Sequence, residues 1–211
     1  MLFNKETALT TAEYLLQIKA VKLSPKELFT WASGIKSPIY CDNRVTLSFP
    51  EIRSYIKEKF AEIIRVKAGL PDLVAGVATG GIPQGAMVAD ILGLPFAYVR
   101  SGRKDHGLAN QIEGKVEAGQ QAVVVEDLVS TGKSSLDAVE ALKEAGCRVM
   151  GMVAIFTYNL PVSEKGFAAA GCPLYTLTDY DTLVEKALAI QYITKDDLQV
   201  LTEFKASLAN R

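Results

Sequence analysis

The sequence has few cysteines and a single histidine, and this scarcity excludes several kinds of site. Cys41, Cys147 and Cys172 lie far apart, and no two of them form a CxxC pair. An odd, scattered set of cysteines argues against a disulfide framework and is typical of a reducing compartment. Zinc sites built from thiolates are also excluded, and the lone His106 excludes most sites built from imidazoles.

Neither sign of charge dominates, and no apolar run is long. The formal net charge is −1, so no basic excess marks the chain as a nucleic-acid binder. The longest apolar stretch, residues 149–156, is far shorter than the roughly 20 residues that cross a bilayer. The N-terminal residues lack a basic region followed by an apolar core, so no signal peptide is evident. We therefore expect a cytoplasmic protein without nucleic-acid or membrane partners.

The composition is that of a globular protein. Of the 211 residues, 49% are hydrophobic and 22% are charged, which is enough apolar material for the core of one domain. Four apolar, β-branched runs are too short for typical helices and do not alternate strictly with polar residues. Such runs predict strands that are covered on both faces, as in parallel sheets. They are residues 73–78, 95–99, 121–125 and 149–156.

Helical patterns lie between and after these runs. Apolar residues recur at helical spacing in residues 52–64, 83–92, 136–142 and 194–208. Strands that alternate with helices predict a doubly wound α/β fold, with a mainly parallel sheet flanked by helices. Residues 1–48 depart from this alternation: we expect a helix at about 10–20, then a stretch punctuated by Ser, Gly and Pro. We interpret them as a small appendage on a single domain that spans residues 1–211.

Acidic and hydroxyl residues follow the third predicted strand. Glu126 and Asp127 end that strand, and a turn at residues 130–135 opens a helix. Backbone N–H groups at a helix N-terminus favour a phosphate. Carboxylates just before the turn can accept hydrogen bonds from sugar hydroxyls. Because ligands of open α/β sheets lie beyond the C-terminal ends of the strands, this run predicts a site for a phosphorylated sugar.

Two other interpretations of the run are weaker. Gly132-Lys133-Ser134 resembles the end of a nucleotide-binding P-loop, which would indicate an NTPase. That pattern requires glycine where the chain has Asp127, and a carboxylate there would repel a polyphosphate. The run could also be an acidic helix cap on a solvated turn, but a cap needs one carboxylate or hydroxyl rather than the whole run.

Residues 123–132 resemble the phosphoribosyl pyrophosphate (PRPP) signature of type I phosphoribosyltransferases: a strand, two acids, two apolar residues, two hydroxyls and a glycine. The resemblance implies that the acids hold the ribose hydroxyls, with Asp127 catalytic, and that the turn holds the 5′-phosphate. Lys133 departs from the family pattern, in which a small residue is more usual. The residues assigned to PRPP are Arg100, Lys104, His106, Glu126, Asp127, Leu128, Val129, Ser130, Thr131, Gly132, Lys133 and Ser134.

Residues 29–44, which we call the hood segment, narrow the resemblance to orotate phosphoribosyltransferases. They are similar to the N-terminal hood of that family, so residues 1–48 would contribute a hood over the active site. Lys36 could neutralise the orotate carboxylate or lie in a surface turn, and Trp31 is expected to pack rather than to hold the base. The residues assigned to orotate are Ser130, Lys36, Tyr40 and Cys41.

Residues 75–83 also match the family. Here Thr79, Gly80 and Gly81 would offer backbone N–H groups to pyrophosphate, or would form only a tight turn from strand to helix. Some family members carry a lysine in the segment of Gly80, another at Ala32, and an arginine near Tyr158. These departures leave open how the orotate carboxylate is neutralised.

Residues 99–107 and 111–114 resemble the family's mobile catalytic loop. A polar segment of this length inside a compact domain is usually functional or disordered. Cationic side chains placed where negative charge develops on the departing pyrophosphate lower the activation barrier of the transfer. By the resemblance, Lys104 is the principal catalytic residue, His106 and Arg100 assist the leaving group, and the loop acts across a homodimer interface. The alternative is a solvated, charged loop with an incidental histidine.

Taken together, the resemblance implies transfer of the 5-phosphoribosyl group from PRPP to orotate. The products are orotidine 5′-monophosphate and pyrophosphate, in de novo pyrimidine biosynthesis. Mg²⁺ would be held mainly through PRPP rather than by a cage of protein ligands. The alternatives are a phosphoribosyltransferase for a purine or another base, and a binding regulator that keeps the PRPP pocket without its chemistry.

Overall fold

A six-stranded sheet forms the centre of the computed structural model, which describes residues 1–31, 33–100, 102 and 111–209. The strand order is β10-β9-β8-β5-β6-β7, and every neighbouring pair is parallel except β6 and β7. The mainly parallel, doubly wound sheet predicted from the sequence is therefore confirmed. The strands are β5 (Leu73–Val77), β6 (Phe96–Val99), β7 (Ile112–Glu113), β8 (Gln121–Val129), β9 (Arg148–Thr157) and β10 (Leu174–Asp179).

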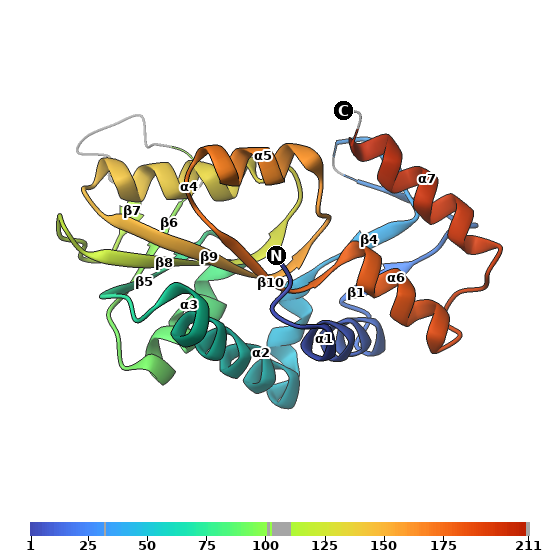
Figure 1. The fold of residues 1–211 in the computed structure, drawn as a ribbon. Helices are drawn as coiled ribbons and strands as arrows, with labels where there is room; N and C mark the ends of the chain where they lie inside the picture. Colours follow the sequence, from blue (N-terminus) through green and yellow to red (C-terminus); the bar gives the residue numbers. More distant parts are fainter. Residues whose placement is uncertain (32, 101, 103–110, 210–211) are drawn as a thin grey trace.

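Helices cover both faces of this sheet (Figure 1). One face carries α1 (Lys5–Gln17), α2 (Pro50–Ile63) and α3 (Gly81–Leu92), and the other carries α4 (Lys133–Glu144) and α5 (Pro161–Ala169). Successive residues of β8 enter different cores: Val123 and Val125 belong to the first, and Val124 belongs to the second. Burial on both faces explains why these strands lack a polar alternation in the sequence.

The chain reverses its winding direction between β5 and β8. β5 leads through α3 to β6 on one side, whereas β8 leads through α4 to β9 on the other. The C-terminal ends of these neighbouring strands therefore diverge onto opposite faces of the sheet. A topological switch point of this kind leaves a crevice in which α/β proteins bind ligands. The two segments assigned to PRPP, after β5 and at the end of β8, both lie there.

The N-terminal residues build small elements beside the sheet. β1 (Val21–Leu23) pairs with β4 (Ile39–Cys41), and β2 (Phe29–Thr30) pairs with β3 (Lys36–Ser37), both antiparallel. A 3₁₀ helix, η1 (Asn43–Ser48), then leads into α2. The C-terminal helices α6 (Tyr180–Ala189) and α7 (Asp197–Ala209) lie on the same side of the molecule (Figure 1). A function of residues 1–48 as a hood stays a prediction.

Trp31 joins the hood segment to the C-terminal part of the chain. Its ring meets Tyr158 and Phe204 edge-on, with centroid distances of 5.8 and 5.7 Å, and its Nε1 donates to the Ile39 carbonyl at 3.0 Å. Two ring contacts and a satisfied indole N–H are the contacts expected of a packing residue.

Several predicted boundaries were wrong. The first helix spans Lys5–Gln17 rather than about 10–20, because Asn4 caps it by accepting from the Thr7 N–H at 2.8 Å. β8 continues to Val129, beyond the two acids that were expected to end the strand, so both acids lie within it. The sequence patterns also did not predict α5, β10 and α6, which complete the sheet and its cover.

Candidate active site

Asp127 lies at the switch point and is fixed by contacts from three sides. Its N–H donates to Glu126 Oε1 at 2.9 Å, and its carbonyl accepts from Asn43 Nδ2 at 2.7 Å. On the third side, a Cβ built on Gly80 would lie only 2.2 Å from the Asp127 Cγ. The half-buried carboxylate therefore stands directly against the predicted pyrophosphate loop.

The glycines after β5 have a spatial function. A Cβ on Gly81 would lie 2.3 Å from the Val125 carbonyl oxygen, and one on Gly80 would overlap the Asp127 carboxylate. Only glycine lets the start of α3 approach β8 this closely. The lysine that some family members carry in this segment has no room at Gly80 while Asp127 keeps this position. Thr79, by contrast, is exposed.

Glu126 is buried and makes different contacts from its neighbour. Only 4% of the residue is exposed, and its Oε2 accepts from the Ser135 hydroxyl at 3.0 Å in the first turn of α4. Burial, together with the adjacent Asp127 carboxylate, raises the pKa of Glu126 to about 9. The side chain therefore carries a proton near neutral pH and ties β8 to the start of α4.

The phosphate turn, residues 130–134, leads into α4. Gly132 is the N-cap residue with φ of 82°, a left-handed conformation that favours glycine, and no side chain caps the helix. The interpretation of the acids as a helix cap is therefore wrong. Thr131, Lys133 and Ser134 are exposed. An uncapped helix N-terminus beside a lysine leaves N–H donors and positive charge for a phosphate.

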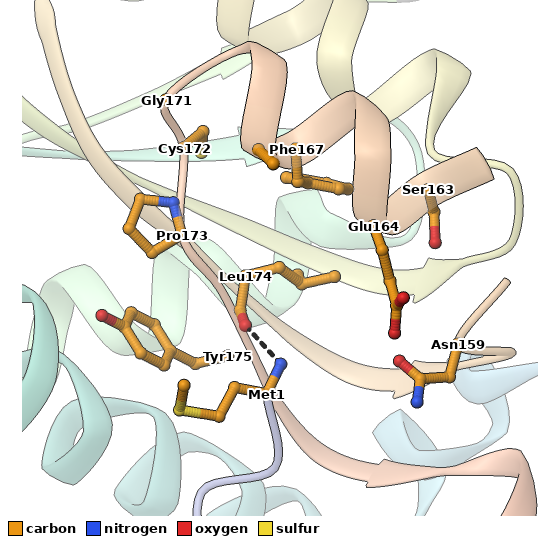
Figure 2. Close-up of a pocket in the computed structure, with 11 residues that line it drawn as sticks. Met1, Asn159, Ser163, Glu164, Phe167, Gly171, Cys172, Pro173, Leu174 and Tyr175 are labelled. Carbon is orange, nitrogen blue, oxygen red and sulfur yellow. Dashed lines mark hydrogen bonds between the residues drawn. The ribbon is translucent and has the colours of Figure 1, made fainter. Parts of the chain in front are cut away.

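Helix α5 supports the turn from behind. A Cβ on Gly132 would lie 3.1 Å from Phe167 and 3.4 Å from Ser163, so these side chains fix the depth of the turn. The same two residues line a cavity of about 480 Å³, which Met1 also lines while its amino group donates to the Leu174 carbonyl at 2.8 Å (Figure 2). None of the residues assigned to either substrate lines this cavity.

The residues assigned to orotate lie in different environments. Lys36 is exposed, and its ammonium donates to the Thr30 hydroxyl at 2.7 Å within the β2–β3 hairpin. Tyr40 is 40% exposed and its ring packs on Phe29. Cys41 is half-buried, and burial with the nearby Asp127 and Asp42 carboxylates raises the pKa of its thiol well above the ordinary value. Cys41 thus stays protonated.

The base of the predicted catalytic loop is closed by hydrogen bonds. The Arg100 N–H donates to the Gln111 carbonyl at 2.8 Å, and Gln111 Nε2 donates to the Arg100 carbonyl at 3.0 Å. The Arg100 guanidinium pairs with Glu113 at 3.2 Å and, with Ser134, lines a cavity of about 70 Å³. Arg100 and the phosphate turn therefore share one cavity. Lys104 and His106 lie outside the described residues.

Tyr158 packs in the core, which explains a position that the sequence left open, and Asn43 is a site residue that the sequence analysis missed. Tyr158 is 2% exposed and packs against Trp31 and Phe156, so its phenol offers no charge to a substrate. Asn43, which lies in the hood segment and was given no role from the sequence, contacts Asp127 directly. Its position two residues after Cys41 was the only indication in the sequence.

The acids at this site suit a metal that arrives with its substrate. Within the described ranges, no group of three or more His, Cys, Asp or Glu side chains could hold a metal ion. Asp127 faces the crevice, whereas Glu126 is buried and protonated. Mg²⁺ commonly binds one or two carboxylates together with substrate phosphates, and this donor set fits that pattern.

No helix in the described part of the chain is long and apolar enough to cross a bilayer.

Comparisons with known proteins agree with this geometry. Residues 47–169 match the phosphoribosyl transferase domain family. The chain is 55% identical over 199 residues to an orotate phosphoribosyltransferase of Bacteroides fragilis, covering 94% of each chain. It is 57% identical over 194 residues to one of Listeria monocytogenes, covering 92% of this chain and 93% of the other.

A solved structure extends the similarity to the whole fold. The crystal structure of orotate phosphoribosyltransferase from Aeropyrum pernix superposes with a TM-score of 0.75 at 31% identity, covering 87% of this chain and 99% of that one. The family match covers β5 to β9, the predicted pyrophosphate loop and the phosphate turn, and the relatives extend it over the hood segment. The chain therefore belongs to the orotate phosphoribosyltransferases, within the phosphoribosyltransferase family.

Proposed function

We propose that the protein transfers the 5-phosphoribosyl group of PRPP to orotate in pyrimidine biosynthesis. A ring nitrogen of orotate gives up its proton to the medium and forms a bond to the anomeric carbon of the ribose, while the bond from that carbon to pyrophosphate breaks and its electron pair leaves with pyrophosphate. Orotidine 5′-monophosphate and pyrophosphate are the products. The observation that carries this proposal is Asp127, which stands between the pyrophosphate loop at Gly80 and the hood segment at Asn43.

Each part of PRPP has a matching group in this arrangement. The Asp127 carboxylate accepts hydrogen bonds from the ribose hydroxyls, while Glu126, whose oxygens already hold Asp127 and Ser135, supports it from behind. The exposed N-terminus of α4 with Lys133 receives the 5′-phosphate. Thr79 and the two glycines that follow it present backbone N–H groups to pyrophosphate.

The catalytic loop completes the proposed mechanism. Arg100 and Gln111, at the base of the predicted loop, are hydrogen-bonded to each other, and Arg100 lines one cavity with Ser134 of the phosphate turn. By family resemblance, Lys104 and His106 stabilise the charge that grows on pyrophosphate, and loop closure excludes water from the oxocarbenium-like sugar. We also propose that the loop serves the site of a second copy in a homodimer and that the enzyme is cytoplasmic.

Mg²⁺ is the proposed cofactor. Asp127 would hold it together with the ribose and pyrophosphate oxygens, and the ion would neutralise the leaving group and orient it. The protein's own residues position the ribose, exclude water and support the phosphate turn.

The test is direct turnover. Purified protein would be mixed with orotate, PRPP and Mg²⁺, and orotate loss followed optically for wild type, Lys104→Ala and Lys115→Ala. Lys115 is a matched control because it is an exposed lysine that pairs with Glu117. We expect turnover that needs all three components, collapses in Lys104→Ala and persists in Lys115→Ala.

Two results would overturn the proposal in different ways. Turnover of hypoxanthine, guanine or uracil in place of orotate would keep the ribose site but show that the hood segment selects another base. Tight PRPP binding with no turnover of any base would instead identify a binding regulator.

A further inference from the structure

Asn43 links the hood segment to the ribose-binding strand although 84 residues separate it from Asp127. The residue is 1% exposed. Its Nδ2 donates to the Asp127 carbonyl at 2.7 Å, and its Oδ1 accepts from the Cys41 thiol at 3.4 Å. One amide thus connects a residue assigned to orotate with the residue assigned to the ribose hydroxyls.

The chemistry of both neighbours fixes the orientation of this amide. A backbone carbonyl can only accept, so it requires the N–H side of Asn43. The Cys41 thiol, which keeps its proton, donates to the oxygen side. Leucine could supply neither contact, and aspartate would set a carboxylate oxygen against the Asp127 carbonyl. Asparagine is therefore required here for its paired donor and acceptor, not for its size.

We propose that Asn43 is a positioning residue that couples the base site, through Cys41, to the ribose-binding Asp127. This inference rests on the proposed function. Orotate that settles against Cys41 orders the thiol and the amide, and the amide then holds the Asp127 main chain in register with the Gly80 loop. The result is synergy: a ligand in the base site strengthens binding in the ribose site, and the converse holds by thermodynamic linkage.

The chain offers a matched control for a purely structural role. η1 is also hydrogen-bonded to the helix that covers the sheet: Gln84 Nε2 of α3 donates to the Thr46 hydroxyl at 3.1 Å. Gln84→Met removes that bond at nearly constant volume, while the Thr46 hydroxyl can still donate to the Asn43 carbonyl at 2.6 Å. The side-chain contacts of Asn43 with Cys41 and Asp127 are not removed by this substitution. Among the residues that the structure describes, none donates to the Gln84 Oε1, so its removal leaves no donor unpaired. Gln84 belongs to neither substrate site.

The experiment compares wild type, Asn43→Ala, Asn43→Asp and Gln84→Met at a temperature where circular dichroism shows all four folded. Turnover of orotate is measured with saturating substrates. Orotate affinity is measured by titration calorimetry with and without ribose 5-phosphate, which fills the ribose and phosphate sites but cannot react. Loss of one buried hydrogen bond that leaves the Asp127 carbonyl unpaired corresponds to about a tenfold effect.

We expect both Asn43 variants to lower kcat about tenfold and to abolish the effect of ribose 5-phosphate on orotate affinity, with Gln84→Met within about twofold of wild type. Two results would overturn the coupling: an equal fall of kcat in Asn43→Ala and Gln84→Met, or an unchanged effect of ribose 5-phosphate on orotate affinity in Asn43→Ala. In either case, turnover by the wild type would still uphold the proposed function. Wild type that binds ribose 5-phosphate but never converts orotate would overturn both.

Discussion

The carboxylate of Asp127 fills the space into which a side chain at Gly80 would project. A Cβ on Gly80 would lie 2.2 Å from both Cγ and Oδ2 of Asp127, which is far closer than non-bonded atoms approach. The φ of Gly80, −68°, is open to any residue, so glycine is needed here for space and not for backbone freedom. This contact sets the separation between the predicted pyrophosphate loop and β8.

The first prediction concerns Gly80→Ala. The added methyl must displace the Asp127 carboxylate or the loop, and displacement of a reacting group by about 1 Å can cost roughly 100-fold in rate. We expect kcat/KM for PRPP to fall about 10–100-fold, with far-UV circular dichroism unchanged. Gly166→Ala is the control, because its Cβ would meet only the flexible end of Leu136. Near-normal activity of Gly80→Ala would show that Asp127 is free to move.

The second prediction concerns stability and pH at Glu126. In the folded chain this carboxyl keeps its proton up to a pKa of about 9, against an ordinary value of 4.5 that applies once the chain unfolds. Between these values the folded state binds more protons, so Glu126 lowers the free energy of unfolding as pH rises, by at most about 1.4 kcal/mol per pH unit. Glu126→Gln, which cannot ionise, removes this contribution.

Urea unfolding of wild type and Glu126→Gln from pH 5 to pH 9 checks this effect. The variant should lose less stability than wild type as pH rises, since glutamine keeps the oxygen that accepts from the Asp127 N–H and offers an N–H to Ser135. Glu58→Gln, an exposed substitution on α2, should follow the wild-type profile. Parallel profiles for all three proteins would show that Glu126 is ionised in the folded state.

The sequence predicted the middle of the fold well because those strands are buried on both faces. Val123, Val124 and Val125 enter two cores, and such runs admit little except a parallel strand. The end of β8 was harder to predict. Glu126 and Asp127 suggest a turn by composition, yet the ladder with β9 continues to Val129. Tertiary pairing overrode a local preference there.

The site was predictable as a motif but not as a geometry. Residues 126–134 predicted a site for the ribose and the phosphate, and the run lies at the switch point between β8 and α4. The contacts of Asp127 with Asn43 and Gly80 cross between distant segments, and no local pattern encodes such pairs. The protonated state of Glu126 likewise depends on burial that only the folded chain creates.

The third prediction concerns Lys133 at the first position of α4. Its ammonium is exposed beside the uncapped helix N-terminus, so it should attract the 5′-phosphate. We expect Lys133→Ala to raise KM for PRPP about fivefold, equivalent to about 1 kcal/mol, with kcat little changed. The difference from wild type should shrink as salt is added, because screening weakens an exposed charge. Lys165→Ala on α5 is the control. An equal KM for PRPP in the two variants would show that Lys133 does not contact the 5′-phosphate.

The last prediction separates packing from base recognition at Trp31. Its ring lies between Tyr158 and Phe204, and its indole N–H is satisfied by the Ile39 carbonyl. Trp31→Phe loses that bond and part of the ring contact, so the free energy of unfolding should fall by about 1–3 kcal/mol in guanidinium titrations followed by circular dichroism. KM for orotate should change less than about threefold, which is below 1 kcal/mol. The opposite pattern, with normal stability and a large rise in KM for orotate, would mean that the ring stacks on the base. That outcome conflicts with a ring already covered by two aromatic neighbours.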